Sequence, residues 1–113
     1  MTKRPWGTWD VLRRGVRWQA KRLIVRPKKR LSLQFHRYRS EYWIVAAGTG
    51  LLTVGKRTRR VAPGSMVKIP VRTAHRVHNT GTVDLHIIEV QLGARIREDD
   101  IVRLADDFGR ALS

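Results

Sequence analysis

The 113-residue sequence contains no cysteine. Disulfide bonds, thiolate nucleophiles and sulfur-ligated metal sites are therefore all excluded. Long apolar runs are also missing. Residues 1–6 lack the apolar core of a signal peptide, and no stretch approaches the roughly 20 apolar residues of a membrane-spanning helix. These absences predict a cytoplasmic protein without a membrane partner.

Acidic residues are scarce, because 9 Asp and Glu stand against 24 Lys and Arg, which gives a net charge of +15. Such a charge favours anionic partners: nucleic acid, an anionic membrane surface, or small phosphorylated or carboxylated ligands. Many of the basic residues lie in expected turns, where solvation alone accounts for them. Neither a recognition helix nor aromatic residues interleaved with a basic patch are evident, so nucleic acid is not the expected partner.

The length allows one domain, residues 1–113, with one hydrophobic core. Short apolar or alternating segments divided by Gly and Pro turn signals predict an all-β barrel or sandwich. Strands are expected at residues 18–25, 31–36, 41–47, 51–54, 58–62, 66–69 and 83–91. From Asp99 the apolar period becomes helical, so an amphipathic helix at about 99–112 is expected to pack against the barrel.

Two short patterns bring together residues that bind metals. Gln34 and His36 are two residues apart, and strand alternation puts both side chains on one face. Glu41 and His75 can close the site from neighbouring strands. Two imidazoles, one carboxylate and one amide oxygen suit a divalent metal ion such as zinc, manganese, cobalt or iron.

The spacing of these residues resembles the two sequence motifs of the cupin superfamily. Gln34 stands where the first histidine of the family usually stands, and Lys28 and Arg72 occupy two positions where glycine is usual in turns. The agreeing positions are His36, Glu41, Gly48, Gly64, Pro70, His75 and Asn79. The resemblance implies a single-domain cupin, a jelly-roll β-barrel, with one divalent metal ion on Gln34, His36, Glu41 and His75.

Further strings resemble the carboxy-terminal cupin of type II mannose-6-phosphate isomerases. They include Arg4-Pro5-Trp6-Gly7, Arg39-x-Glu41-x-Trp43, Ile88-Glu89-Val90-Gln91-x-Gly93 and Glu98-Asp99-Asp100-Ile101-x-Arg103. In that family this cupin often follows a mannose-1-phosphate guanylyltransferase domain, and the pair supplies GDP-mannose. The resemblance implies an aldose-ketose isomerase that interconverts mannose 6-phosphate and fructose 6-phosphate through an enediol.

Such a reaction needs a base within hydrogen-bond reach of the substrate proton. Glu89 and His86 are the candidates, although a buried salt bridge for Glu89 and a surface position for His86 fit equally well. Arg39 and Arg103 are the candidates for binding the sugar phosphate, because arginine can contact phosphate through two nitrogens. Pairing with nearby carboxylates is the alternative role of both arginines.

Two rival hypotheses remain. Tyr38 and Tyr42 stand where members of the family commonly have histidines, and if one of those histidines carries protons, this chain is a non-catalytic module that binds sugar phosphate. A basic nucleic-acid-binding protein is the third hypothesis and rests on charge alone. The resemblance also implies a homodimer, with residues 4–7 and Trp9 either at its interface or packed across the base of the same barrel.

Overall fold

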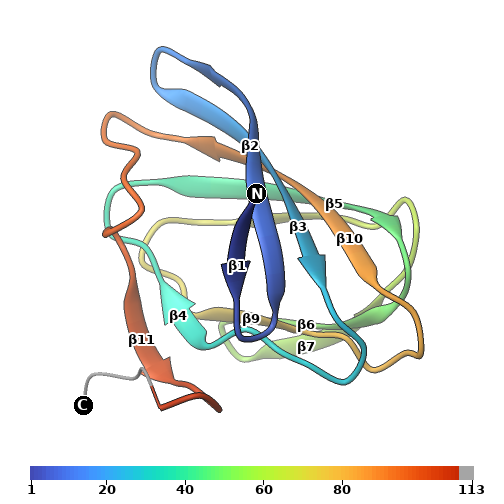
Figure 1. The fold of residues 1–113 in the computed structure, drawn as a ribbon. Coiled ribbons are helices and arrows are strands. Elements are labelled where there is room, and N and C mark those ends of the chain that lie inside the picture. The colour runs from blue at the N-terminus through green and yellow to red at the C-terminus, as the bar shows by residue number, and fades with distance from the viewer. Residues whose placement is uncertain (110–113) are drawn as a thin grey trace.

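Residues 1–109, which the computed structural model describes, form eleven strands in two antiparallel sheets. The first sheet has the order β1-β2-β3-β10-β5-β8, with β1 (Thr2–Arg4), β2 (Gly7–Gly15), β3 (Trp18–Val25), β10 (Leu85–Leu92), β5 (Ser40–Ala47) and β8 (Met66–Ile69). The second has the order β11-β4-β9-β6-β7, with β11 (Val102–Ala105), β4 (Leu33–Phe35), β9 (His75–His78), β6 (Gly50–Val54) and β7 (Arg57–Val61). The sheets face each other around one interior, and the β2–β3 hairpin extends beyond them (Figure 1).

Strand register divides the inner face of the first sheet into an apolar half and a polar half. β10 pairs with β3 on one side and with β5 on the other, so buried residues of the three strands lie in rungs. The apolar rung is Leu23, Ile87 and Val45; the next is Lys21, Glu89 and Trp43; the last is Gln19, Gln91 and Glu41. The polar half therefore lies directly beside the apolar core that holds it in place.

The apolar half packs against the second sheet to form the core. Leu85 and Ile87 of β10 are at most 1% exposed, and Leu52 and Val77 of the second sheet belong to the same buried cluster. Burial of each such side chain contributes roughly 1.5–3 kcal/mol to the free energy of unfolding. This core fixes the strands from which the polar side chains project.

The backbone at Lys28 and Arg72 explains why glycine is usual at these two turn positions. Both residues have left-handed backbone conformations, with φ of 67° and 55°. This is the region of φ in which glycine carries no steric cost. The usual glycines at these positions thus reflect turn geometry, and this chain accepts a larger residue at both.

The all-β prediction is confirmed, and each predicted strand is found within two residues of its expected bounds. Four strands were not predicted: β1, β2, β9 and β11.

The helix predicted at about 99–112 is wrong over its described part, because Val102–Ala105 form β11 and pair with β4. The edge of β4 offers these residues backbone hydrogen bonds that their own sequence pattern does not reveal. Residues 110–112 lie outside the described residues. Within the described part of the chain, no helix is long and apolar enough to cross a membrane.

Asn79, the last residue of the second motif, joins three chain segments at the end of β9. Its side chain is fully buried, and its amide nitrogen donates to the carbonyl oxygens of Val25 and Val83, each at 2.8 Å. Its amide oxygen accepts a hydrogen bond from the backbone nitrogen of Gly81 at 2.9 Å. Asn79 therefore acts as a structural link between β3, β9 and the turn that precedes β10.

We expect Asn79→Ala to lower the free energy of unfolding by about 2–4 kcal/mol, because it leaves three backbone groups without partners. Urea denaturation measures the loss. Thr80→Ala is the matched control, since Thr80 is the exposed neighbour. Equal stability of the two variants would contradict the assigned role.

Candidate metal centre and its pocket

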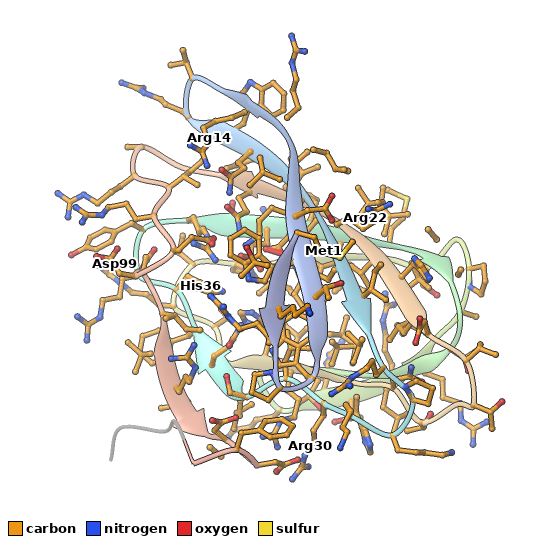
Figure 2. The ribbon with its side chains drawn as sticks, viewed as in Figure 1. Met1, Arg14, Arg22, Arg30, His36 and Asp99 are labelled. Atoms are coloured by element: carbon orange, nitrogen blue, oxygen red, sulfur yellow. The ribbon has the colours of Figure 1, made fainter. Side chains whose placement is uncertain are left out.

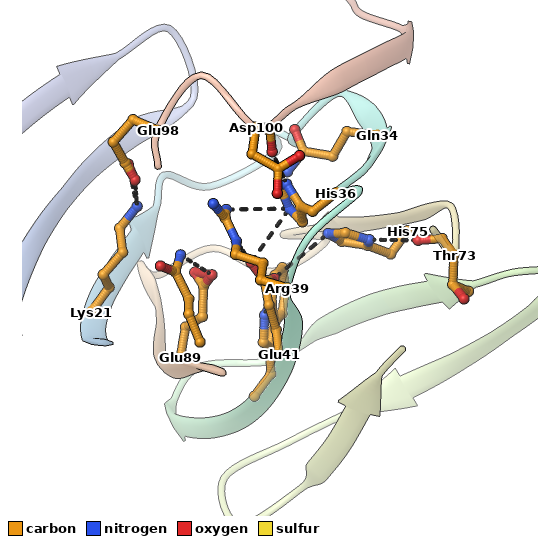
Figure 3. Close-up of polar contacts among 12 residues, drawn as sticks. Lys21, Gln34, His36, Arg39, Glu41, Thr73, His75, Glu89, Glu98 and Asp100 are labelled. Atoms are coloured by element: carbon orange, nitrogen blue, oxygen red, sulfur yellow. Dashed lines mark hydrogen bonds and ion pairs between the residues drawn. The ribbon is translucent and has the colours of Figure 1, made fainter. Parts of the chain in front are cut away.

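Three side chains from three strands or strand ends converge in the interior. His36 follows β4, Glu41 lies in β5 and His75 begins β9, and one ligand atom from each lies within 4.8 Å of the other two. His36 Nε2 is 3.3 Å from Glu41 Oε2, and His75 Nε2 is 3.8 Å from Glu41 Oε1. All three side chains are at most 4% exposed, and Figure 3 shows them pointing toward one another. The predicted ligands are thus brought together.

Backbone carbonyls fix the orientation of both imidazoles. His36 Nδ1 donates to the carbonyl oxygen of Asp100 at 2.6 Å, and His75 Nδ1 donates to that of Thr73 at 3.0 Å. Each Nε2 then carries the lone pair and faces Glu41. His75 Nε2 is buried and has no hydrogen-bond partner among the described residues. The orientation matches that of metal-binding histidines, whose second nitrogen is held by a carbonyl or carboxylate.

Burial also keeps the two imidazoles neutral, as a metal ligand must be. Desolvation, followed by the charge of Arg39 and that of His75, lowers the pKa of His36 to about 4. Desolvation likewise lowers the pKa of His75. At neutral pH both rings can therefore offer a lone pair without first losing a proton.

Gln34 occupies the fourth predicted ligand position. It is the direct antiparallel partner of His75, so the two side chains lie beside each other on one face of the second sheet. Its Oε1 accepts a hydrogen bond from Ser32 Oγ at 2.7 Å, and it lines the same pocket as His36 and Glu41. The donor set fits a divalent metal ion: two nitrogens, a carboxylate and an adjacent amide oxygen.

The Arg39 side chain is held by hydrogen bonds beside the candidate metal ligands. It is buried, its Nε donates to Glu41 Oε2 at 2.8 Å, and its Nη1 donates to the carbonyl oxygen of Arg97 at 2.9 Å. Its Nη2 lies 3.4 Å from His36 Nε2. The charge of Arg39 opposes a second cation at the same atoms, so bonds from the ligand atoms must offset that repulsion. Arg39 also has few donors left for a phosphate group.

Glu89 lies in the same pocket, one strand away from Glu41. Burial, followed by the charge of Glu41 and a hydrogen bond with it, raises the pKa of Glu89 to about 7. Gln91 Nε2 donates to Glu89 Oε2 at 2.9 Å, and Gln19 Nε2 donates to Gln91 Oε1 at 3.0 Å. The Glu89 carboxyl is therefore held in one orientation beside the candidate ligands.

The remaining predicted residues divide between the pocket and the surface. Arg103, on β11, lines the pocket. His86 does not line it, because it is three residues from Glu89 on β10 and faces the other side of the sheet. Tyr38 and Tyr42 also lie outside the pocket, with 45% and 39% of each residue exposed.

Sequence reasoning missed several residues that line the pocket. They are Arg4, Trp6, Trp9, Lys21 and Glu98. The position of Lys21 in the pocket could have been predicted from strand alternation, because Lys21 shares the inward face of β3 with buried Leu23 and Val25. Figure 2 shows Arg14 on the β2–β3 hairpin and Arg30 at the lower edge of the fold, both away from the buried His36.

Solved structures confirm the predicted fold. A protein with a double-stranded β-helix domain from Klebsiella pneumoniae aligns with a TM-score of 0.78 at 12% identity, over 95% of this chain and 90% of the other. The double-stranded β-helix is the cupin barrel. At this identity the likeness concerns the fold alone.

Curated proteins show much higher sequence identity to this chain than the solved structure does. The alginate biosynthesis protein AlgA of Pseudomonas aeruginosa is 45% identical over 107 residues, which cover 95% of this chain and 22% of the relative. A mannose-1-phosphate guanylyltransferase of Escherichia coli is 40% identical, again over 95% of this chain and 22% of its own length. The chain thus spans about a fifth of the length of these relatives.

The family described as mannose-6-phosphate isomerase C-terminal matches residues 1–106, nearly the whole described chain. The match covers both motifs and every candidate ligand. On this evidence the chain belongs to the mannose-6-phosphate isomerase C-terminal family.

Proposed function

We propose that this chain is a metal-dependent isomerase that interconverts mannose 6-phosphate and fructose 6-phosphate. The observation that carries the proposal is the convergence of His36, Glu41 and His75, with the buried Glu89 carboxyl in the pocket that His36 and Glu41 line. Membership of a family described as mannose-6-phosphate isomerase C-terminal supports the choice of substrate. The native metal ion is one of zinc, manganese, cobalt or iron.

The residues of the chain prepare the pocket for a metal ion and a sugar. Thr73 and Asp100 hold the two imidazoles through their carbonyl oxygens, and Trp43 Nε1 donates to Glu41 Oε1 at 3.0 Å. These contacts hold the ligand atoms before any ion arrives. A divalent metal bound there supplies positive charge that stabilises the negative charge developing on the substrate oxygens.

Glu89 is the group that we assign to proton transfer between C1 and C2 of the sugar. It is buried, lines the pocket and lies across the strand pair from Trp43 and one rung from Glu41. Gln91 donates to Glu89 Oε2, and Glu89 also shares a hydrogen bond with Glu41, so the carboxyl group is oriented within the pocket. His86, the other candidate base, faces away from the pocket and is therefore not assigned this role.

The alternative of a module that binds sugar phosphate without turnover rested on Tyr38 and Tyr42. Both side chains are exposed, and the Tyr38 ring contacts the Arg95 guanidinium at 4.6 Å, outside the pocket. Side chains at these positions do not reach the candidate ligands. Their identity therefore gives no reason to prefer binding alone.

We expect His75→Asn to weaken divalent metal binding and isomerase turnover by at least about a hundredfold each, because it removes one of the candidate ligand side chains. Calorimetric titration with manganese measures the first effect, and coupled detection of fructose 6-phosphate measures the second. His78→Asn is the matched control, since His78 lies on the same strand but faces the other side of the sheet and is not part of the cluster. Unchanged metal binding in His75→Asn would contradict the proposal.

Glu89 also makes stability depend on pH. Its carboxyl is neutral in both the folded and the unfolded chain below its ordinary pKa of 4.5, whereas between this value and about 7 only the unfolded chain ionises it. The stability that the neutral group contributes is therefore present at low pH and is lost as the pH rises through 7.

The Glu89→Gln variant has no ionisable group at this position, so its stability does not fall in this way as the pH rises. Relative to the native chain, we expect its free energy of unfolding to rise by about 3 kcal/mol between about pH 4.5 and about pH 8. Urea denaturation at both pH values, with a chelator present, measures the difference. A constant difference between the two proteins across this interval would show that folding does not raise the pKa of Glu89.

A further inference from the structure

The pocket contains a buried ammonium group that the proposed chemistry does not yet use. Lys21 projects inward from β3, where it is the direct strand partner of Glu89. Its side chain is only 7% exposed, and its Nζ lies 3.8 Å from the centre of the Trp9 ring. Lys21 therefore places a positive charge directly across the strand pair from Glu89, the group that we assign to proton transfer.

The carboxylate that pairs with Lys21 comes from outside the two sheets. Glu98 lies in the segment between β10 and β11, and its oxygens lie 2.8 and 3.0 Å from Lys21 Nζ. Figure 3 shows the contact between the two side chains; that of Glu98 is 44% exposed, whereas that of Lys21 is 7% exposed. A buried cation needs an anionic partner, but a carboxylate so exposed to water is held only weakly. Another anion can therefore take its place at little cost.

Other residues that line the pocket also suit an anion on a sugar. Arg4 and Arg103 line the same pocket as Lys21, and Arg4 lies 5.6 Å from the Trp9 ring. Trp6 and Trp9 contribute flat apolar surfaces beside these cations. Gln34, His36 and Glu41 line the same pocket, and Arg103 is the strand partner of Gln34, so a molecule bound there would meet both the cations and these candidate metal ligands.

Arg39 differs from Lys21 in its partners. Its Nε and Nη1 are occupied by the buried Glu41 carboxylate and by the Arg97 carbonyl oxygen. Displacing Glu41 would leave a buried charge unpaired, whereas displacing Glu98 would release a carboxylate into water. Of these two buried cations, Lys21 is thus the one that can exchange its partner.

We propose that Lys21 binds the phosphate group of the sugar substrate, and that the Glu98 carboxylate occupies this position until the phosphate displaces it. The inference rests on the proposed function, because it takes a sugar phosphate as the substrate. It replaces Arg39 by Lys21 as the principal phosphate ligand and leaves Arg103 as a second cation of the same pocket.

Binding of mannose 6-phosphate to the purified full chain tests Lys21 by calorimetry. Lys21→Met is compared with Arg22→Met, because the two residues are adjacent on β3, face opposite sides of the sheet and carry the same charge. We expect Lys21→Met to weaken binding about ten- to hundredfold and Arg22→Met to leave it unchanged. Binding of unphosphorylated mannose is expected to be the same in both variants. Equal affinities of the two variants for mannose 6-phosphate would overturn the proposal.

Glu98→Gln tests the exchange independently of any folding defect in Lys21→Met. It removes the competing charge, so we expect mannose 6-phosphate to bind about three- to tenfold more tightly. Asp99→Asn is its control, because this neighbouring carboxylate pairs with Arg97 and its side chain is 70% exposed. No gain over Asp99→Asn would overturn the exchange.

The same titrations separate this inference from the isomerase itself. Binding that depends on Lys21, in a chain that never produces fructose 6-phosphate with any divalent metal, would support the phosphate site and reject the isomerase. Turnover that is equally efficient in Lys21→Met and Arg22→Met would support the isomerase and reject the phosphate site. Equal affinities of the native chain for mannose 6-phosphate and for mannose would also reject the phosphate site.

Discussion

Burial of the Glu41 carboxylate is the constraint on which the pocket depends. A carboxylate removed from water is stable only when other groups compensate its charge and fill its hydrogen-bonding capacity. Here Arg39 and Trp43 each donate to one of its oxygens, and the imidazoles of His36 and His75 lie beside it. The side chains that stabilise Glu41 are thus the same ones that shape the candidate metal centre.

Strand register connects this centre to the stability of the whole fold. Along β10 the inward positions change from apolar Ile87 to Glu89 and Gln91; β3 changes in the same rungs, whereas β5 changes one rung later, from Trp43 to Glu41. A slip of one residue would turn each of these side chains outward, which would expose the core and bury the opposite face. The apolar half therefore secures the position of the polar half.

The sequence predicted the part of the site that is determined by local geometry. Gln34 and His36 are two residues apart in an extended segment, so strand alternation alone places them on one face. Contacts between distant residues were not predictable in this way. Glu98 reaches Lys21 across 77 residues of sequence, and Val102–Ala105 adopt a strand because β4 has an edge to pair with. Neither fact is encoded in the periodicity of the segment concerned.

Crystallographic anomalous diffraction from the manganese-loaded chain tests the central claim most directly. The account predicts one anomalous peak within bonding distance of an imidazole nitrogen of His36, an imidazole nitrogen of His75 and a carboxylate oxygen of Glu41. A chain that crystallises with the same fold but shows no peak at these three side chains, or shows manganese only at surface carboxylates, would contradict it.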